Sequence, residues 1–333
     1  MKNLSTIQHF VGCDVSKDTL DFAIFEHGKD YRMFEHIQVD NSQEGFQQLR
    51  KWLRTFKINL KDTVIAMEHT GFYSSALSEW CFKKGIPFVM LHPMDVKMAC
   101  TRGRNKTDST DAKFIADYVY TMREKLDLSA PEPAGIKLLR ELRNERRMAV
   151  RARTAYLNQL KTVKEKETQR RIKKVIESFT EQIKDIESAI KKEIENDPEM
   201  SKNYHLLISI PGIGLVNAMT TIVATGNFTR FRNARQYAKF ACVSPLSRES
   251  GTSIRGGNHV TRIGHIDIKS TLTEGACSAM THDPQIKAYY ERKRSQGKSY
   301  GCIMNAIKFK LICRMFAVVK RNTPYANTEA FRS

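Results

Sequence analysis

The sequence predicts an α/β amino-terminal domain, a long helical middle region and a mainly α-helical carboxyl-terminal domain. In the first hundred residues, short apolar or alternating runs are interspersed with amphipathic stretches. Residues 136–197 contain neither Gly nor Pro and are rich in Lys, Arg, Glu, Leu and Ile, as expected for long helix. Beyond them, apolar helical segments flank the turn Pro211-Gly212-Ile213-Gly214. We therefore expect domains at residues 1–130, 131–202 and 203–333.

The amino-terminal elements follow the order βββαβαβ and then a helix. Ser42 is placed to cap the first helix, and Gly85 is a natural end for the second. A mixed sheet with helices on its faces accommodates this order, and it is the arrangement of ribonuclease H. The expected strands are residues 10–15, 20–25, 31–39, 64–67 and 86–91, and the expected helices begin near residues 42 and 73.

Four carboxylates occupy the positions that a nuclease of the ribonuclease-H type requires. Asp14 ends the first strand, Glu68 ends the fourth, and Asp108 and Asp111 open the helix after the fifth. Their spacing of three places both aspartates on one helix face, close to the positive end of the helix dipole. Carboxylate oxygens are ligands for Mg²⁺ or Mn²⁺, and two such ions can clamp the attacking and leaving oxygens of a phosphodiester. The pattern predicts a metal-dependent nuclease site.

The helical middle region contains a regular apolar seam in its second half. The seam residues recur at alternating steps of 4 and 3, as in a coiled coil, which predicts a dimerisation region. Two amphipathic helices packed within one chain are the alternative, with a hinge or hairpin in the polar run between residues 164 and 171. The seam consists of Ile172, Ile176, Phe179, Ile183, Ile186 and Ile190.

The charge of the chain points to a polyanionic partner. Lys and Arg number 55 against 36 Asp and Glu, giving a formal net charge of +19. No stretch approaches the roughly 20 apolar residues of a membrane span, and no apolar signal-peptide core follows Met1. We expect a cytoplasmic, nucleic-acid-binding protein without a membrane partner.

Two segments of the carboxyl-terminal domain are candidates for contact with a nucleic-acid backbone. The Pro-Gly-Ile-Gly turn predicts a helix-hairpin-helix in which Gly212 and Gly214 expose amides to a phosphate, with a plain helical turn as the alternative. The basic loop around Ser250 carries Arg248 and Arg255. Its serine is either a turn residue, a phosphate-contacting hydroxyl, or a nucleophile that attacks a phosphodiester once a base, metal or cation activates it.

With these motifs in view, the chain resembles the DEDD transposases of bacterial insertion sequences, the family numbered one hundred and ten, also called bridge-RNA-guided recombinases. The resemblance spans nearly the whole chain. It rests on Gly12-Cys13-Asp14-Val15-Ser16-Lys17, Glu68-His69-Thr70-Gly71, Lys106-Thr107-Asp108-Ser109-Thr110-Asp111-Ala112, the helical middle, the Pro-Gly-Ile-Gly turn and Ser250-Gly251.

The resemblance implies a RuvC-like domain whose acidic tetrad is Asp14, Glu68, Asp108 and Asp111, a coiled-coil dimerisation region, and a carboxyl-terminal transposase domain. It also implies a serine nucleophile, which maps onto Ser250. The family commonly has Ser-Ser-Gly-Gly where this chain has Glu249-Ser250-Gly251-Thr252, so Ser247 and Ser253 remain alternatives. A structured guide RNA, the bridge RNA, is implied to pair with donor and target DNA.

The motifs together with the resemblance thus predict a DNA recombinase of an insertion sequence that cuts and rejoins double-stranded donor and target DNA, and the resemblance implies that an RNA guides it. Because tetrad and serine lie in different predicted domains, we expect two protomers of a homo-oligomer, a dimer or tetramer, to assemble one active site. The reaction would place the protein at the bacterial nucleoid. The alternatives are a hydrolytic RuvC-like Holliday-junction nuclease, in which water attacks, and a non-catalytic nucleic-acid-binding scaffold.

Overall fold

A computed structural model of the chain describes residues 4, 7–26, 35–68, 72–91, 96, 108–250, 254–260 and 265–326. The side chains of residues 25, 26, 72, 108, 109, 246–250 and 254–260 lie outside this description. The chain divides into two compact units, Met1–Pro131 and Glu132–Ser333. Each unit has its own hydrophobic core, so each is treated separately below.

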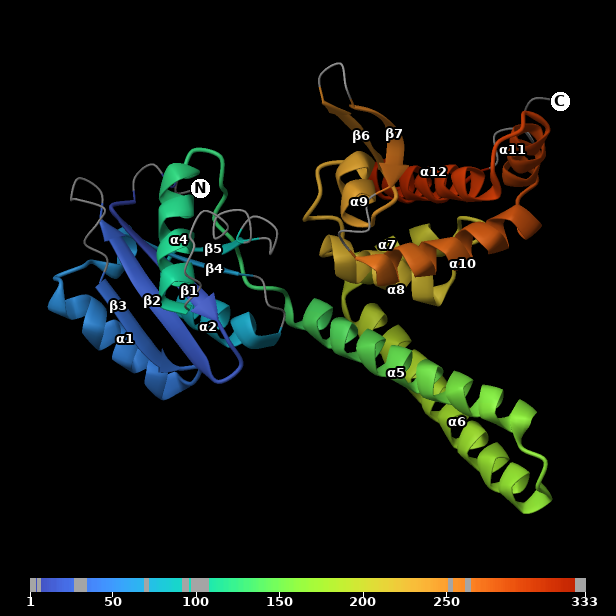
Figure 1. Ribbon diagram of the computed structural model, residues 1–333, viewed down its shortest axis with the longest axis horizontal. Helices are drawn as coiled ribbons and strands as arrows, with labels where there is room; N and C mark the ends of the chain where they lie inside the picture. The colour runs from blue at the N-terminus through green and yellow to red at the C-terminus, as the bar shows by residue number, and fades with distance from the viewer. Residues whose placement is uncertain are drawn as a thin grey trace. The chain divides into compact units, whose positions relative to one another are not determined.

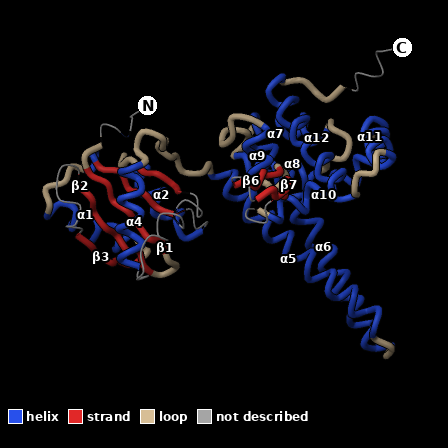
Figure 2. Tube along the Cα trace, turned by 45° about the horizontal axis from the view of Figure 1, so that its top comes forward, coloured by secondary structure: helices blue, strands red, loops and turns tan. Residues whose placement is uncertain are grey.

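The amino-terminal unit is built on a five-stranded mixed sheet (Figures 1 and 2). Its order is β3-β2-β1-β4-β5, so the first strand is central. The first three strands form an antiparallel meander, and β4 and β5 continue from β1 in parallel. This confirms the mixed sheet expected from the sequence. The strands are β1 (His9–Val15), β2 (Thr19–Glu26), β3 (Glu35–Asp40), β4 (Thr63–Glu68) and β5 (Phe88–Leu91).

Helices cover both faces of this sheet. On one face, α1 (Gln43–Thr55) and α2 (Phe72–Lys83) cover a core that includes Cys13, Met67 and Trp80. Ser42 caps α1 as expected, its hydroxyl accepting a hydrogen bond of 3.2 Å from the Gly45 amide. A short 3-10 helix, η2 (Leu60–Asp62), leads into β4. On the other face, α4 (Asp108–Thr121) lies across β1 and β2.

The carboxyl-terminal unit begins with two long helices that pack against each other (Figure 1). α5 (Ala134–Thr162) and α6 (Lys166–Asn196) are joined by a three-residue loop, residues 163–165, which overlaps the start of the polar run predicted to contain a hinge or hairpin. The seam residues Ile183, Ile186 and Ile190 belong to the hydrophobic core of this one unit. The structure therefore covers much of the seam by packing within one chain, and a dimeric coiled coil stays a prediction.

The rest of this unit is helical apart from one hairpin. Its core gathers buried side chains from the helices after α6, including Leu207, Tyr237, Leu272 and Met315. None of the described helices is long and apolar enough to cross a bilayer. The helices are α7 (Pro198–Ile208), α8 (Leu215–Thr225), α9 (Ala234–Phe240), α10 (Ile266–His282), α11 (Pro284–Ser295) and α12 (Tyr300–Arg321), and the hairpin is β6 (Pro245–Ser250) with β7 (Ile254–Val260).

Candidate active site

Asp14 and Glu68 lie on one face of the sheet, near its central strands. The parallel register pairs Gly12 with Ala66 and Cys13 with Met67, so Asp14 and Glu68 are the next residues along β1 and β4. Side chains alternate between the faces of a strand. Cys13 and Met67 point into the core beneath α1 and α2, which puts Asp14 and Glu68 on the face that α4 covers. Both side chains are half-buried.

Gly12 allows α4 to approach this face closely. A Cβ atom at Gly12 would lie 2.1 Å from the carbonyl oxygen of Ala112 and 2.5 Å from the amide nitrogen of Ala116. Only a residue without a side chain fits beneath the helix here. The first turn of α4, with Asp111, is thereby held against the strand that carries Asp14.

Asp111 contributes to the electrostatics of Glu68. Burial raises the pKa of the Glu68 carboxyl, and the negative charge of Asp111 raises that pKa further. Asp108 opens the same helix three residues earlier, and its side chain lies outside the described residues. Residues at this spacing share a helix face, so the backbone places Asp108 on the side of α4 that bears Asp111.

The chemistry of these groups suits a hard divalent cation. Neighbouring carboxylates that repel each other, as Glu68 and Asp111 do, are stabilised when a cation lies between them. Within the described part of the chain, which omits the Asp108 side chain, no group of three or more His, Cys, Asp or Glu is placed to hold a metal ion. The acidic tetrad as a metal-ligand set therefore stays a prediction.

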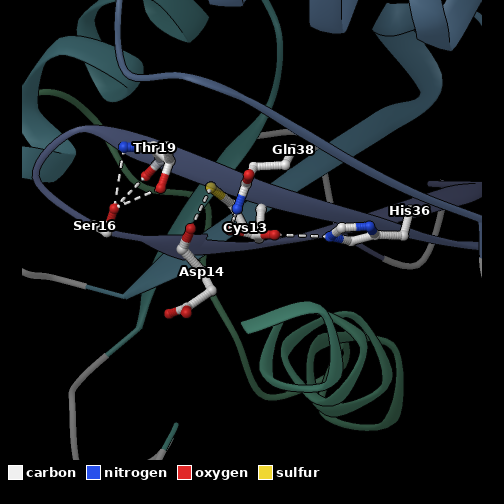
Figure 3. Close-up of polar contacts among 7 residues, drawn as sticks. Cys13, Asp14, Ser16, Thr19, His36 and Gln38 are labelled. Atoms are coloured by element: carbon white, nitrogen blue, oxygen red, sulfur yellow. Dashed lines mark hydrogen bonds and ion pairs between the residues drawn. The ribbon is translucent and has the colours of Figure 1, made fainter. Parts of the chain in front are cut away.

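Sequence reasoning missed three polar residues on the same face of the sheet. Asp21 of β2 pairs directly with Asp14 across the antiparallel ladder, and Gln38 of β3 pairs with Asp21. Asp21 is 4% exposed, and its carboxylate has hydrogen-bond contacts with His36 and Gln38, whose side chains are drawn in Figure 3. The signal was present in the sequence, because Asp21 is the one charged residue within the apolar run of residues 20–25.

Ser250 lies at the end of the β6–β7 hairpin. It is the last residue of β6, and its backbone pairs with Ile254, the first residue of β7. Ser247 lies within β6, at an irregularity in the register between residues 246 and 248, and Ser253 falls outside the described residues. Arg248 and Arg255 occupy strand positions whose side chains are not described. The backbone of Ser250 is thus paired in the hairpin, and residues 251–253, which follow it, lie outside the described part of the chain.

The Pro-Gly-Ile-Gly segment joins α7 to α8, as a helix-hairpin-helix requires, but its two glycines differ in role. Gly212 has a φ of +91°, and a Cβ there would lie 2.5 Å from the carbonyl oxygen of Gly275 on α10. Its position is therefore explained by close packing within the unit. Gly214 caps α8 without a side-chain hydrogen bond, is exposed, and has no heavy atom within 4 Å of an added Cβ. Backbone contacts by these glycines stay a prediction.

The amino-terminal unit, with its five-stranded mixed sheet and helices on both faces, has a ribonuclease-H-like fold, and a helical unit follows it in the chain. A family profile for DEDD transposases matches residues 11–165, and one described as transposase IS116/IS110/IS902 family matches residues 204–291. Together the two profiles cover most of the chain, which belongs to the IS110 family of transposases.

Individual relatives are consistent with this membership. A pilin gene-inverting protein of Moraxella bovis is 26% identical over 323 residues, covering 95% of this chain and 97% of its own. An insertion element IS110 protein of Streptomyces coelicolor is 32% identical over 120 residues, which are 36% of this chain and 29% of that protein. Among solved structures, Thermus thermophilus RuvC in complex with a Holliday junction substrate matches 37% of this chain and 99% of its own, with 14% identity and a TM-score of 0.28.

Proposed function

We propose that this transposase is a DNA recombinase that cuts and rejoins strands with Asp14, Glu68, Asp108 and Asp111 as its acidic site and Ser250 as its nucleophile. The observation that carries the proposal is the convergence of β1, β4 and α4. Gly12 brings the helix onto the strand, and the charge of Asp111 acts on Glu68. Family membership supports the reaction class.

The acidic residues would hold Mg²⁺ or Mn²⁺, which when bound supplies charge stabilisation for a phosphodiester under attack. The contribution of the chain is to fix these carboxylates on rigid elements. Asp14 is the penultimate residue of β1 and Glu68 is the last residue of the adjacent parallel strand β4, and Asp108 and Asp111 lie in the first turn of a helix that is packed on the sheet. Preorganised ligands of this kind lose little conformational entropy when they bind an ion.

Ser250 would act as the attacking group. In this step the Oγ–phosphorus bond forms, the bond from phosphorus to one sugar oxygen breaks, and the serine proton passes to a base as the leaving oxygen takes up a proton. The phosphoserine ester conserves the energy of the broken bond, so a second strand can be joined without ATP. The place of Ser250 at the end of a two-stranded hairpin supports its access to a DNA strand.

Double-stranded donor and target DNA are the proposed substrates, with a structured bridge RNA as guide. The net charge of +19 supports a polyanionic partner. The relatives named for pilin gene inversion support rearrangement of DNA segments as the outcome. The proposed assembly is a homo-oligomer acting at the bacterial nucleoid, and sedimentation with and without nucleic acid would measure its state.

Trapping tests the chemistry. The purified protein is incubated with bridge RNA, DNA carrying the element ends, target DNA and Mg²⁺, then denatured and resolved on gels. We expect a protein–DNA adduct with wild type that is absent with Ser250→Ala and persists with the matched controls Ser247→Ala and Ser253→Ala. Cleavage without any adduct would favour the hydrolytic mechanism. Unchanged DNA under all conditions would favour a non-catalytic scaffold.

A further inference from the structure

A buried carboxylate lies directly opposite Asp14 on the neighbouring strand. Asp21 of β2 is the register partner of Asp14 of β1, and the two residues face the same side of the sheet, beneath α4. The Cβ atoms of such a pair are ordinarily about 4.5 to 5.5 Å apart. Only 4% of Asp21 is exposed. The charge of Asp21 is therefore close to Asp14 and poorly screened by water.

Both carboxylate oxygens of Asp21 have partners on β3. His36 Nε2 lies 2.8 Å from Oδ1, and Gln38 Nε2 donates to Oδ2 at 3.0 Å. Gln38 lies straight across from Asp21 and His36 lies on the diagonal, and Asp14 is the register partner of Asp21 on the other side, so Gln38, Asp21 and Asp14 occupy paired positions on three neighbouring strands. Figure 3 shows the side chains of Asp14, His36 and Gln38. These contacts fix the orientation of the Asp21 carboxylate.

Packing alone does not explain a charge at this position. Like charges directly opposite each other in a sheet are destabilising, and burying a carboxylate costs free energy even when it is hydrogen-bonded. At the next position on this face, Ala23 is fully buried under the same helix. A small neutral residue thus satisfies the packing there, whereas Asp21 adds a negative charge beside a site that is already acidic.

We propose that Asp21 is a positioning residue for the acidic site, a fixed charge that strengthens the hold of Asp14 and its neighbours on a divalent cation. The inference rests on the proposed function, since it assumes that these carboxylates bind the cation. In this role Asp21 acts through the electric field at Asp14, while His36 and Gln38 hold its carboxylate in place. Groups that support metal ligands in this way commonly change metal affinity by about 10- to 100-fold when they are replaced.

The experiment measures Mn²⁺ affinity directly, by electron paramagnetic resonance of free Mn²⁺ titrated with the full-length protein. Asp21→Asn removes the charge and retains the shape. We expect its Mn²⁺ dissociation constant to rise by about 10-fold. The separate variant Asp21→Glu keeps the negative charge, so we expect it to retain most of the wild-type affinity for Mn²⁺. Glu44→Gln is the matched control, because it neutralises an exposed carboxylate on α1, on the opposite face of the sheet, and should leave the affinity unchanged.

Asp14→Asn separates failure of this inference from failure of the proposed function. If wild type does not bind Mn²⁺, or Asp14→Asn binds it equally well, the metal site itself is wrong. If Asp14→Asn weakens binding and Asp21→Asn does not, the role of Asp21 alone is overturned. Should Asp21→Asn not fold, Asp21→Ala replaces it, because the same face accommodates the small neutral Ala23 and the exposed His36 and Gln38 side chains can turn to water; the same rise in the dissociation constant is expected. Failure of both to fold would assign Asp21 to stability only and overturn the proposal.

Discussion

Replacing Gly12 by alanine should separate α4 from β1. The added Cβ would lie 2.1 Å from the Ala112 carbonyl oxygen and 2.5 Å from the Ala116 amide nitrogen, whereas ordinary contacts of a Cβ begin at 3.4 Å. Both obstructing atoms belong to the backbone of one helix, so no side-chain rotation relieves the overlap. The helix or the strand must move by about 1 Å to restore normal contact, a distance that follows from the gap between 2.1 and 3.4 Å.

That displacement has two measurable costs. Overpacking a close-packed interior typically costs about 1 to 3 kcal/mol of folding free energy. A shift of about 1 Å in catalytic groups can lower a rate by about 100-fold. Because Asp111 is carried by α4 and influences Glu68 on β4, we expect the loss of activity in Gly12→Ala to exceed what the lost stability explains.

Urea unfolding and a plasmid-based DNA rearrangement assay would measure these effects. Gly301→Ala is the control, because an added Cβ at Gly301 meets no heavy atom within 4 Å and alanine favours the helix α12 in which it lies. Wild-type stability together with wild-type activity in Gly12→Ala would refute the argument that this glycine places the acidic site.

Three further predictions follow from burial and charge. Burial and Asp111 raise the pKa of Glu68 above its ordinary value of 4.5, so the metal-free folded state binds this proton more tightly than the unfolded state. The stabilisation that this proton provides is therefore lost as pH rises through the raised pKa, and above that pKa Glu68→Gln should be more stable than wild type in urea titrations containing EDTA. For Asp267, burial raises the pKa, but the charge of Arg143 and its hydrogen bond outweigh this, so the pKa is lowered from 3.8. Asp267→Asn should cost about 1 to 3 kcal/mol at pH 7, a difference that shrinks as pH falls through the lowered pKa, and a pH-independent difference would contradict the ion pair. Ile190→Ala should destabilise the α5–α6 hairpin by about 2 to 4 kcal/mol in thermal or urea unfolding, because this side chain is fully buried.

The sheet could be predicted because the hydrophobic pattern of the individual strands agrees with the way the strands pair in the structure. The apolar residues of β1 and β4 alternate or run continuously as buried strands do, and Ser42 marks the start of α1. The placement of Asp14 and Glu68 at strand ends followed from the same pattern. Asp21 was missed because its partners on β3 are 15 and 17 residues away. No local rule connects residues at that distance until the register of the sheet is known.

The helical seam shows a different limit of sequence reasoning. Steps of 4 and 3 identify the apolar face of α6, and Ile183, Ile186 and Ile190 are buried there. The spacing does not identify the helix that covers this face. In the structure α5 of the same chain packs on it, and the Nε atom of Arg146 on α5 donates to Glu187 on α6 at 2.8 Å. Periodicity alone cannot distinguish an intramolecular hairpin from an intermolecular coiled coil, because both bury the same face.

Gly12 and Gly212 show that a glycine in a functional motif can be needed for close packing as well as for chemistry. Gly212 was expected to expose its amide to phosphate, yet it lies where a side chain would collide with Gly275 and Ala279 of α10. Gly12 precedes the acidic residue of β1 by two positions, so both face α4, and its missing side chain lets that helix approach. A strand that bore Asp14 with a larger residue at position 12 would keep the carboxylate and lose the close approach of Asp111. In the proposed site, Gly12 and Asp14 therefore act together, because Asp14 supplies a charge and Gly12 admits the helix that carries Asp111.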